Sequence, residues 1–168
     1  MTDVKSVNPE KTKMSKSAAL LLALCWLSYA CSYIGKLGYN ANIVSIEKFF
    51  NITHASAGTV STFFFFAYGA GQIINGIFCK KYNVKYCVFA VLLISAVCNF
   101  TLGLSDNFTL IKIVWFINGA ALSVLWPSLI RLLSEVLPVK YSPKVVLVMG
   151  TTVATGTFIV YGLSALFV

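Results

Sequence analysis

Five long runs of apolar residues dominate the chain, and short polar or charged segments separate them. The runs cover about residues 17–45, 55–79, 84–105, 110–133 and 145–168. A helix rises about 1.5 Å per residue, so each run is long enough to cross about 30 Å of hydrocarbon. We therefore predict an all-α membrane protein with five transmembrane helices, joined by loops near residues 47–53, 106–109 and 135–144.

The first apolar run contains a polar stripe with a lysine in it. Tyr29, Tyr33, Lys36 and Asn40 are spaced i, i+4, i+7 and i+11, and this spacing places them on one face of a helix. A lysine inside a membrane costs about 2.5–3.5 kcal/mol on insertion scales, and residues kept at that cost commonly bind a solute. Lys36 is therefore a candidate binding residue; the alternative is a side chain that extends to the outer interface.

The second apolar run carries a similar stripe, which consists of Tyr68, Gln72, Asn75 and Cys79. Amide side chains are unfavourable in hydrocarbon unless they face protein or water. The stripe therefore lines a polar cavity or forms hydrogen bonds between helices, and the sequence leaves both interpretations open. Small residues allow helices to approach closely, and we expect such contacts at three glycines beside the stripe, Gly69, Gly71 and Gly76.

The last two runs contain signals of bending and of close packing. Pro127 lacks a backbone N–H and should kink the fourth run. Arg131 and Glu135 near its end are spaced to form an i,i+4 ion pair, although Arg131 could also extend to the interface or line a gate. Residues 150–157 of the fifth run are small and hydroxyl-bearing, which suits tight helix packing or a polar path.

Composition and charge support this membrane assignment and indicate an orientation. Apolar residues make up 58% of the chain and charged residues only 11%, against about a quarter charged in soluble domains. Ten of the thirteen Lys and Arg residues lie in the N-terminal segment or near residues 80–85 and 131–144, whereas Lys48 and Lys112 lie in the opposite loops. The positive-inside rule then places the N-terminus in the cytoplasm. We expect residues 1–16 to be a disordered cytoplasmic tail and residues 17–168 to form the transmembrane region.

Several classes of function find no support in the sequence. The basic residues gather at the ends of apolar runs and form no patch with interleaved aromatic residues, so we expect no nucleic-acid partner. The five cysteines and the single histidine lack the spacing of metal ligands. The chain shows no pairing of a nucleophile with a base and no phosphate-binding loop, so we predict neither an enzyme nor a cofactor.

Four motifs give the chain a resemblance to a known family. They are Tyr33-Ile-Gly-Lys-Leu-Gly-Tyr39, Ala67-Tyr-Gly69, the segment from Asn118-Gly through Trp126-Pro to Arg131, and Gly156. The chain resembles the N-terminal half of a major facilitator superfamily transporter, and is most similar to the organophosphate:phosphate antiporter family. Lys36 falls on a family arginine that binds the phosphate of the substrate.

The resemblance implies a secondary active transporter that moves a small organic anion by alternating access. It implies that Lys36, Tyr33, Tyr68 and Gln72 bind the substrate, with the lysine neutralising the anion. It also implies a cytoplasmic gate at Lys80, Lys81, Arg131 and Glu135, where a lysine pairs with Glu135. Lysine at position 36 replaces the bidentate arginine by a point charge, and Gln72 stands where the family has a second lysine.

The resemblance covers only part of such a transporter. We expect five helices of the six-helix N-terminal half, with the remainder supplied by a longer chain or by a separate chain. The expected surroundings are a lipid bilayer, most simply the plasma membrane. Two alternatives remain, namely a transporter-like sensor of a phosphorylated metabolite and a nonfunctional truncated transporter.

Overall fold

Five helical segments in the structure are long and apolar enough to cross a membrane. The structure is a computed structural model that describes residues 14–78 and 83–167. Within these residues the segments are Lys16–Ala41, His54–Phe78, Val84–Leu104, Phe108–Val136 and Val139–Leu166. The prediction of an all-α membrane protein with five spans is confirmed.

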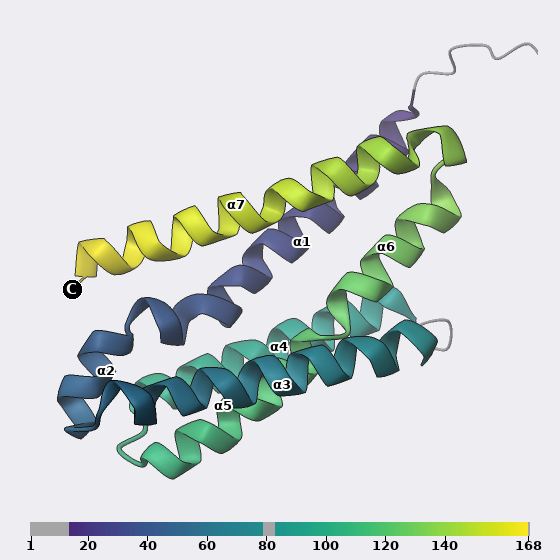
Figure 1. Cartoon of the computed structure of the whole chain (residues 1–168). Helices are drawn as coiled ribbons and strands as arrows, with labels where there is room; N and C mark the ends of the chain where they lie inside the picture. The colour runs from purple at the N-terminus through teal and green to yellow at the C-terminus, as the bar shows by residue number, and fades with distance from the viewer. Residues whose placement is uncertain (1–13, 79–82, 168) are drawn as a thin grey trace, which may run out of the picture.

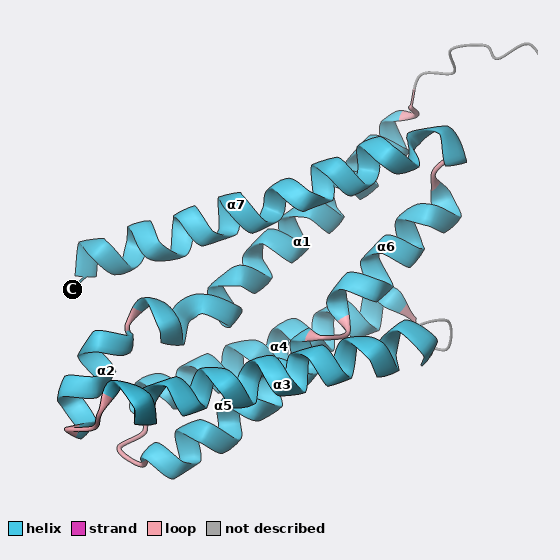
Figure 2. Cartoon of the chain, viewed as in Figure 1, coloured by secondary structure: helices cyan, strands magenta, loops and turns pink. Residues whose placement is uncertain are grey.

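The spans are built from seven α-helices and a short 3₁₀ helix within the described residues (Figures 1 and 2). In chain order they are α1 (Lys16–Ala41), α2 (Ile43–Phe50), α3 (His54–Phe78), α4 (Val84–Leu104), α5 (Phe108–Leu122), α6 (Leu125–Val136), η2 (Val139–Tyr141) and α7 (Ser142–Phe167). Ser15 caps the start of α1 because its side chain accepts a hydrogen bond from the backbone N–H of Ala18.

The helices pack in two groups that share one core. Helix α1 lies along α7, and α5 packs against both α3 and α4 (Figure 1). Trp115 of α5 is fully buried between the rings of Tyr39 from α1 and Phe64 from α3, at centroid distances of 5.7 Å each. Large apolar side chains cover the outside, with Phe66 and Phe100 about 70% exposed. Such a surface is stable only when lipid or further protein covers it.

The loop predicted near residues 47–53 is wrong, because most of it belongs to a helix. The first apolar run contains a helix boundary at Asn42, and α2 follows directly. Ile46 and Phe50 of α2 pack against the core at helical spacing, which favours a helix there. Asn51 then ends α2 in the left-handed conformation, with φ of 51°, a conformation that asparagine tolerates better than most residues.

The fourth span is interrupted, as the proline predicted, but the interruption lies before it. Helix α5 ends at Leu122 and α6 begins at Leu125. Pro127 cannot donate a hydrogen bond to the carbonyl four residues earlier, which belongs to Ser123. The helix therefore breaks one turn before Pro127, at residues 123–124.

Glycines mark the closest helix contacts, but not at every position expected. A Cβ atom added at Gly71 would lie 2.8 Å from the Cβ of Ser123, so α3 and the break in the fourth span require a glycine there. No atom lies within 4 Å of such a Cβ at Gly69 or Gly76, so the prediction of close contacts at these two positions is wrong. Both glycines are exposed.

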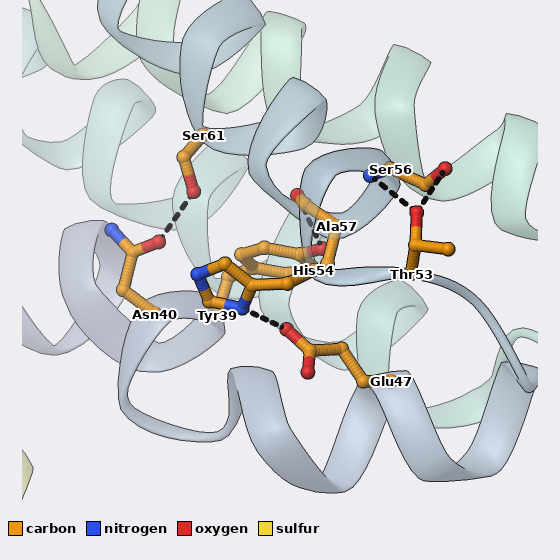
Figure 3. A network of polar contacts seen from close by, with 8 residues as sticks. All are labelled: Tyr39, Asn40, Glu47, Thr53, His54, Ser56, Ala57 and Ser61. Carbon is orange, nitrogen blue, oxygen red and sulfur yellow. Dashed lines mark hydrogen bonds and ion pairs between the residues drawn. The ribbon is translucent and has the colours of Figure 1, made fainter.

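Polar contacts connect α1 and α2 to α3 at the end of the bundle that contains α2 (Figure 3). Tyr39 is fully buried and donates a hydrogen bond from its Oη to the carbonyl of Ala57, at 2.9 Å. Nearby, Ser61 donates to the side chain of Asn40. Glu47 and His54 form an exposed contact of 2.6 Å between α2 and α3. Asn40, the last residue of the lysine stripe in α1, thus serves to hold α1 and α3 together.

Candidate functional site

Lys36 lies on the face of α1 that is turned toward α3, and tyrosine side chains surround its ammonium group. The residue is only 7% exposed. Its Nζ atom lies 3.3 Å from the Oη of Tyr29, which is seven residues earlier in α1. The side chain therefore points back along α1 toward the middle of the span, as helical side chains do, and away from the α2 end. The side chain of Lys36 therefore does not extend to the outer interface, and its role in binding stays a prediction.

Three aromatic rings surround the ammonium group. Nζ of Lys36 lies 4.5 Å from the ring centroid of Tyr29, 4.7 Å from that of Tyr33 and 4.6 Å from that of Tyr68. At such distances the negative faces of the rings stabilise a cation. We call these three residues the tyrosine cage. The cage joins α1 to α3, because Tyr29 and Tyr33 come from α1 and Tyr68 comes from α3.

The hydrogen bonds in the cage leave more donors than acceptors. Tyr68 Oη accepts from Lys36 Nζ at 3.0 Å and from Gln72 Nε2 at 2.7 Å, which fills both acceptor positions of a phenolic oxygen. Tyr29 and Tyr68 share one contact of 3.4 Å, which uses one of their two protons. The ammonium group has three N–H groups, and two of them are used. One N–H of Lys36 therefore has no acceptor among these contacts.

Within the described residues, no carboxylate forms an ion pair with Lys36. The described part of the chain contains three, on Glu47, Asp106 and Glu135. The ion pairs found within it join Glu47 to His54 and Glu135 to Arg131, and none includes Lys36. A buried cation with a surplus of donors and no carboxylate partner is chemically suited to bind an anion.

Tyr33 is held in place by a close contact with α7. A Cβ atom added at Gly156 would lie 2.5 Å from the Cβ of Tyr33 and 2.7 Å from its Cγ. The backbone of α7 therefore lies directly against the side chain of Tyr33, and only glycine leaves enough room. Tyr33 also meets the ring of Tyr29 edge to face, with centroids 5.6 Å apart.

Asparagines hold the backbone of α1 on the side away from the cage. Asn99 of α4 and Asn118 of α5 both donate to the carbonyl of Gly35, at 3.3 and 2.8 Å. Asn118 is fully buried, and its Oδ1 has no partner within the described residues. Gly35 directly precedes Lys36, so these two amides fix the position from which the lysine side chain extends.

The residues expected to form a gate are only partly described. Arg131 and Glu135 form the predicted i,i+4 ion pair, with Nε and Oε1 2.8 Å apart. Lys80 and Lys81 lie outside the described residues, so their pairing with Glu135 stays a prediction. The gate residues that are described lie at the end of α6, far along the span from the cage.

The structure brings together all four residues predicted to bind substrate and adds two, Tyr29 and Trp126, that were not predicted to bind it. Tyr29 contacts Lys36 directly, and its position on the same stripe could have identified it. Trp126, in the first turn of α6, lies against the cage because its ring centroid is 5.0 Å from that of Tyr29. No spacing rule reveals this second contact, since it depends on how α6 is oriented after the break.

Comparison with known proteins gives one family and several distant relatives. The family model described as Major Facilitator Superfamily matches residues 25–168. The membrane sensor protein UhpC of Escherichia coli K12 is 25% identical over 99 residues, which are 59% of this chain and 23% of that protein. A probable hexose phosphate transport protein of Chlamydia trachomatis is 24% identical over 110 residues, which are 66% of this chain and 24% of that protein. The chain thus matches about a quarter of the length of these relatives. No solved structure gives a significant match.

Proposed function

The chain belongs to the major facilitator superfamily, and from this premise we propose that it forms part of a secondary active transporter for a small organic anion. The observation that carries the proposal is the ammonium group of Lys36, which is buried in the tyrosine cage and has no carboxylate partner among the residues that the structure describes. A charge in this setting is costly by itself. Binding of an anion offsets this cost, which would explain why a lysine is present within the membrane span.

The spare donors of the cage define how an anion would be held. The remaining N–H of Lys36 would donate to its oxygens. Gln72 has a second N–H that Tyr68 does not occupy. Tyr33 completes the aromatic wall around the ammonium group. In this proposal Lys36 neutralises charge, while Tyr33, Tyr68 and Gln72 orient the ligand.

Within this class we propose a phosphate ester that exchanges with inorganic phosphate. The support comes from the relatives, two of which are named as a membrane sensor and a hexose phosphate transport protein. A single ammonium group neutralises one charge, so a doubly charged phosphate would need a further cation from a part of the transporter beyond this chain. In the superfamily such sites lie at the midplane between two halves that move against each other.

A sensor of a phosphorylated metabolite is the second candidate. It is favoured by the similarity to a protein named as a membrane sensor. A sensor and a transporter would share the anion site and would differ in whether the ligand crosses the membrane. In either case we propose that the N-terminus of α1 faces the cytoplasm of the plasma membrane, with Arg131, Glu135, Lys80 and Lys81 at the cytoplasmic gate.

The experiment separates binding from flux. The complete transporter that contains this chain is reconstituted into liposomes loaded with ³²P-labelled phosphate, and glucose 6-phosphate is added outside. Binding is measured in parallel by equilibrium dialysis of the purified protein against labelled phosphate. Exchange that Lys36→Met abolishes supports a transporter, and binding without exchange supports a sensor. Absence of both would contradict the proposal of an anion site.

A further inference from the structure

The break in the fourth span lies close to the tyrosine cage, and side chains connect the two. The break is the point at residues 123–124 where α5 ends and α6 begins. The N–H of Val124 donates to Ala121 at 3.3 Å, three residues back, and the carbonyl of Ser123 faces a proline four residues on that has no N–H. Regular helical bonding is therefore interrupted at a single place in the span.

Helix α3 holds this break through a polar contact. Asn75 Nδ2 donates to Ser123 Oγ at 3.0 Å, and Ser123 Oγ donates to the carbonyl of Ala120 at 2.6 Å. The backbone of Gly71 lies so close that an added Cβ would approach Ser123 Oγ to 2.3 Å. Asn75 is on the same face of α3 as Tyr68 and Gln72. One face of α3 thus contacts both the cage and the break.

The first turn of α6 contacts the cage from the other side of the break. The ring of Trp126 lies 5.0 Å from that of Tyr29, whose hydroxyl group meets Lys36 at 3.3 Å. Any shift of Tyr29 toward a bound anion therefore changes the packing of Trp126. Because Trp126 follows the break by only two residues, such a shift acts on α6 more directly than on α5.

The two sides of the break differ in how much room they have. Trp115, Asn118 and Leu122 of α5 are fully buried. Beside α6 there is a cavity of about 610 Å³ between α1, α4 and α6, which Cys25 of α1 and Leu132 and Glu135 of α6 help to line. Helix α6 also buries Leu125, Leu129 and Leu133 in the core, so the cavity leaves room along one face of α6 only.

We propose that residues 123–124 form a hinge through which an anion bound in the cage repositions α6, with Asn75 as the positioning residue that sets the hinge. This rests on the anion binding proposed above. Trp126 transmits the change from Tyr29 to α6, and the Arg131–Glu135 pair at the far end of α6 moves with it. Asn75 touches no ligand; it keeps the break at one fixed place on α3.

The test uses Cys25 as a reporter, because it borders the cavity beside α6. Alanine replaces the other four cysteines, and the rate at which a methanethiosulfonate reagent labels Cys25 is measured with and without inorganic phosphate. We expect phosphate to change this rate by about fivefold or more, the usual range of coupling between two sites. In Asn75→Leu the response should disappear, while the dissociation constant for phosphate stays within about threefold of the parent.

A matched variant and a second position keep the outcome interpretable. Ser61→Ala removes a different hydrogen bond of α3, the one that joins it to α1 at the α2 end. This variant should leave the response intact. Ser123→Ala removes the same hydrogen bond from its other end and should reproduce the effect of Asn75→Leu. It serves as the test variant if Asn75→Leu does not fold. Phosphate binding without any change in Cys25 labelling would overturn the hinge and leave the anion site standing. A protein that binds no phosphate would overturn both proposals.

Discussion

The most informative residue is Lys36, because its surroundings determine what it can do. A lysine at the end of a span reaches water along its own methylene groups. Lys36 instead turns toward the middle of the span, where it has two hydroxyl groups within 3.3 Å and three aromatic rings within 4.7 Å. These contacts stabilise a positive charge without cancelling it. The charge therefore remains available to a ligand.

Removal of the Tyr68 hydroxyl group is expected to weaken both the cage and anion binding. In Tyr68→Phe the ammonium group keeps one phenolic partner, and Gln72 Nε2 loses its acceptor. Loss of a hydrogen bond with a charged donor costs about 1.5–3 kcal/mol. Thermal unfolding in detergent should show lower stability, and equilibrium dialysis should show weaker phosphate binding. Tyr161→Phe, on an exposed side chain of α7, is the control and should change neither stability nor phosphate binding. If Tyr68→Phe also leaves both unchanged, the hydrogen bonds to Tyr68 Oη do not support the cage.

At the level of helices, the lysine and its neighbours were predictable and the contacts between spans were not. The spacing in α1 and α3 correctly placed the described polar residues of each helix on one face, since helical periodicity depends only on the local sequence; Cys79 lies outside the described residues. The loop near residues 47–53 was wrong because packing of Ile46 and Phe50 against the core decides the helix there. The contact of Trp126 with Tyr29 depends on how α6 is oriented after the break in the fourth span. Pro127 predicted that the span would bend, but not the direction in which α6 would run.

Glycines at helix contacts offer a direct test of packing. Gly156→Ala would place a Cβ 2.5 Å from the Cβ of Tyr33, and the α1–α7 contact would have to widen. Overpacking of this kind costs about 1–3 kcal/mol, so we expect lower thermal stability and a disturbed cage. Gly69→Ala is the control, because no atom lies within 4 Å of its added Cβ. Equal stability of the two variants would contradict the close approach of α7 to Tyr33.

The polar contacts at the α2 end should differ in strength according to burial. Tyr39→Phe removes a hydrogen bond from a fully buried hydroxyl group, and we expect a loss of about 0.5–1.5 kcal/mol. Glu47→Gln removes a contact with His54, whose side chain is 79% exposed, and should cost less, since exposed ion pairs contribute about 0–1 kcal/mol. Denaturant titration followed by circular dichroism measures both. A larger loss in Glu47→Gln would show that the exposed contact holds α2 in place.

At the level of the whole molecule, two features describe the chain: its outer surface is apolar, and it matches only part of the length of its relatives. The chain is an integral, multi-pass membrane protein that spans about a quarter of the length of the relatives it resembles. The family and the five spans were predictable because apolar length and local motifs are written directly in the sequence. The residues that would complete the proposed site around Lys36 were not, because the chain spans only about a quarter of the length of these relatives.

The most direct test of the central claim is phosphate binding to Lys36 variants, measured by equilibrium dialysis at fixed ionic strength. Lys36→Met keeps the length of the side chain but removes its charge, and Lys36→Arg keeps the charge. We expect Lys36→Met to weaken binding at least about tenfold, equivalent to about 1.4 kcal/mol, and Lys36→Arg to retain it. Thermal unfolding of all three proteins confirms that the fold is intact. If Lys36→Met binds phosphate as tightly as the unmodified protein, the buried ammonium group does not hold the anion and the account is wrong.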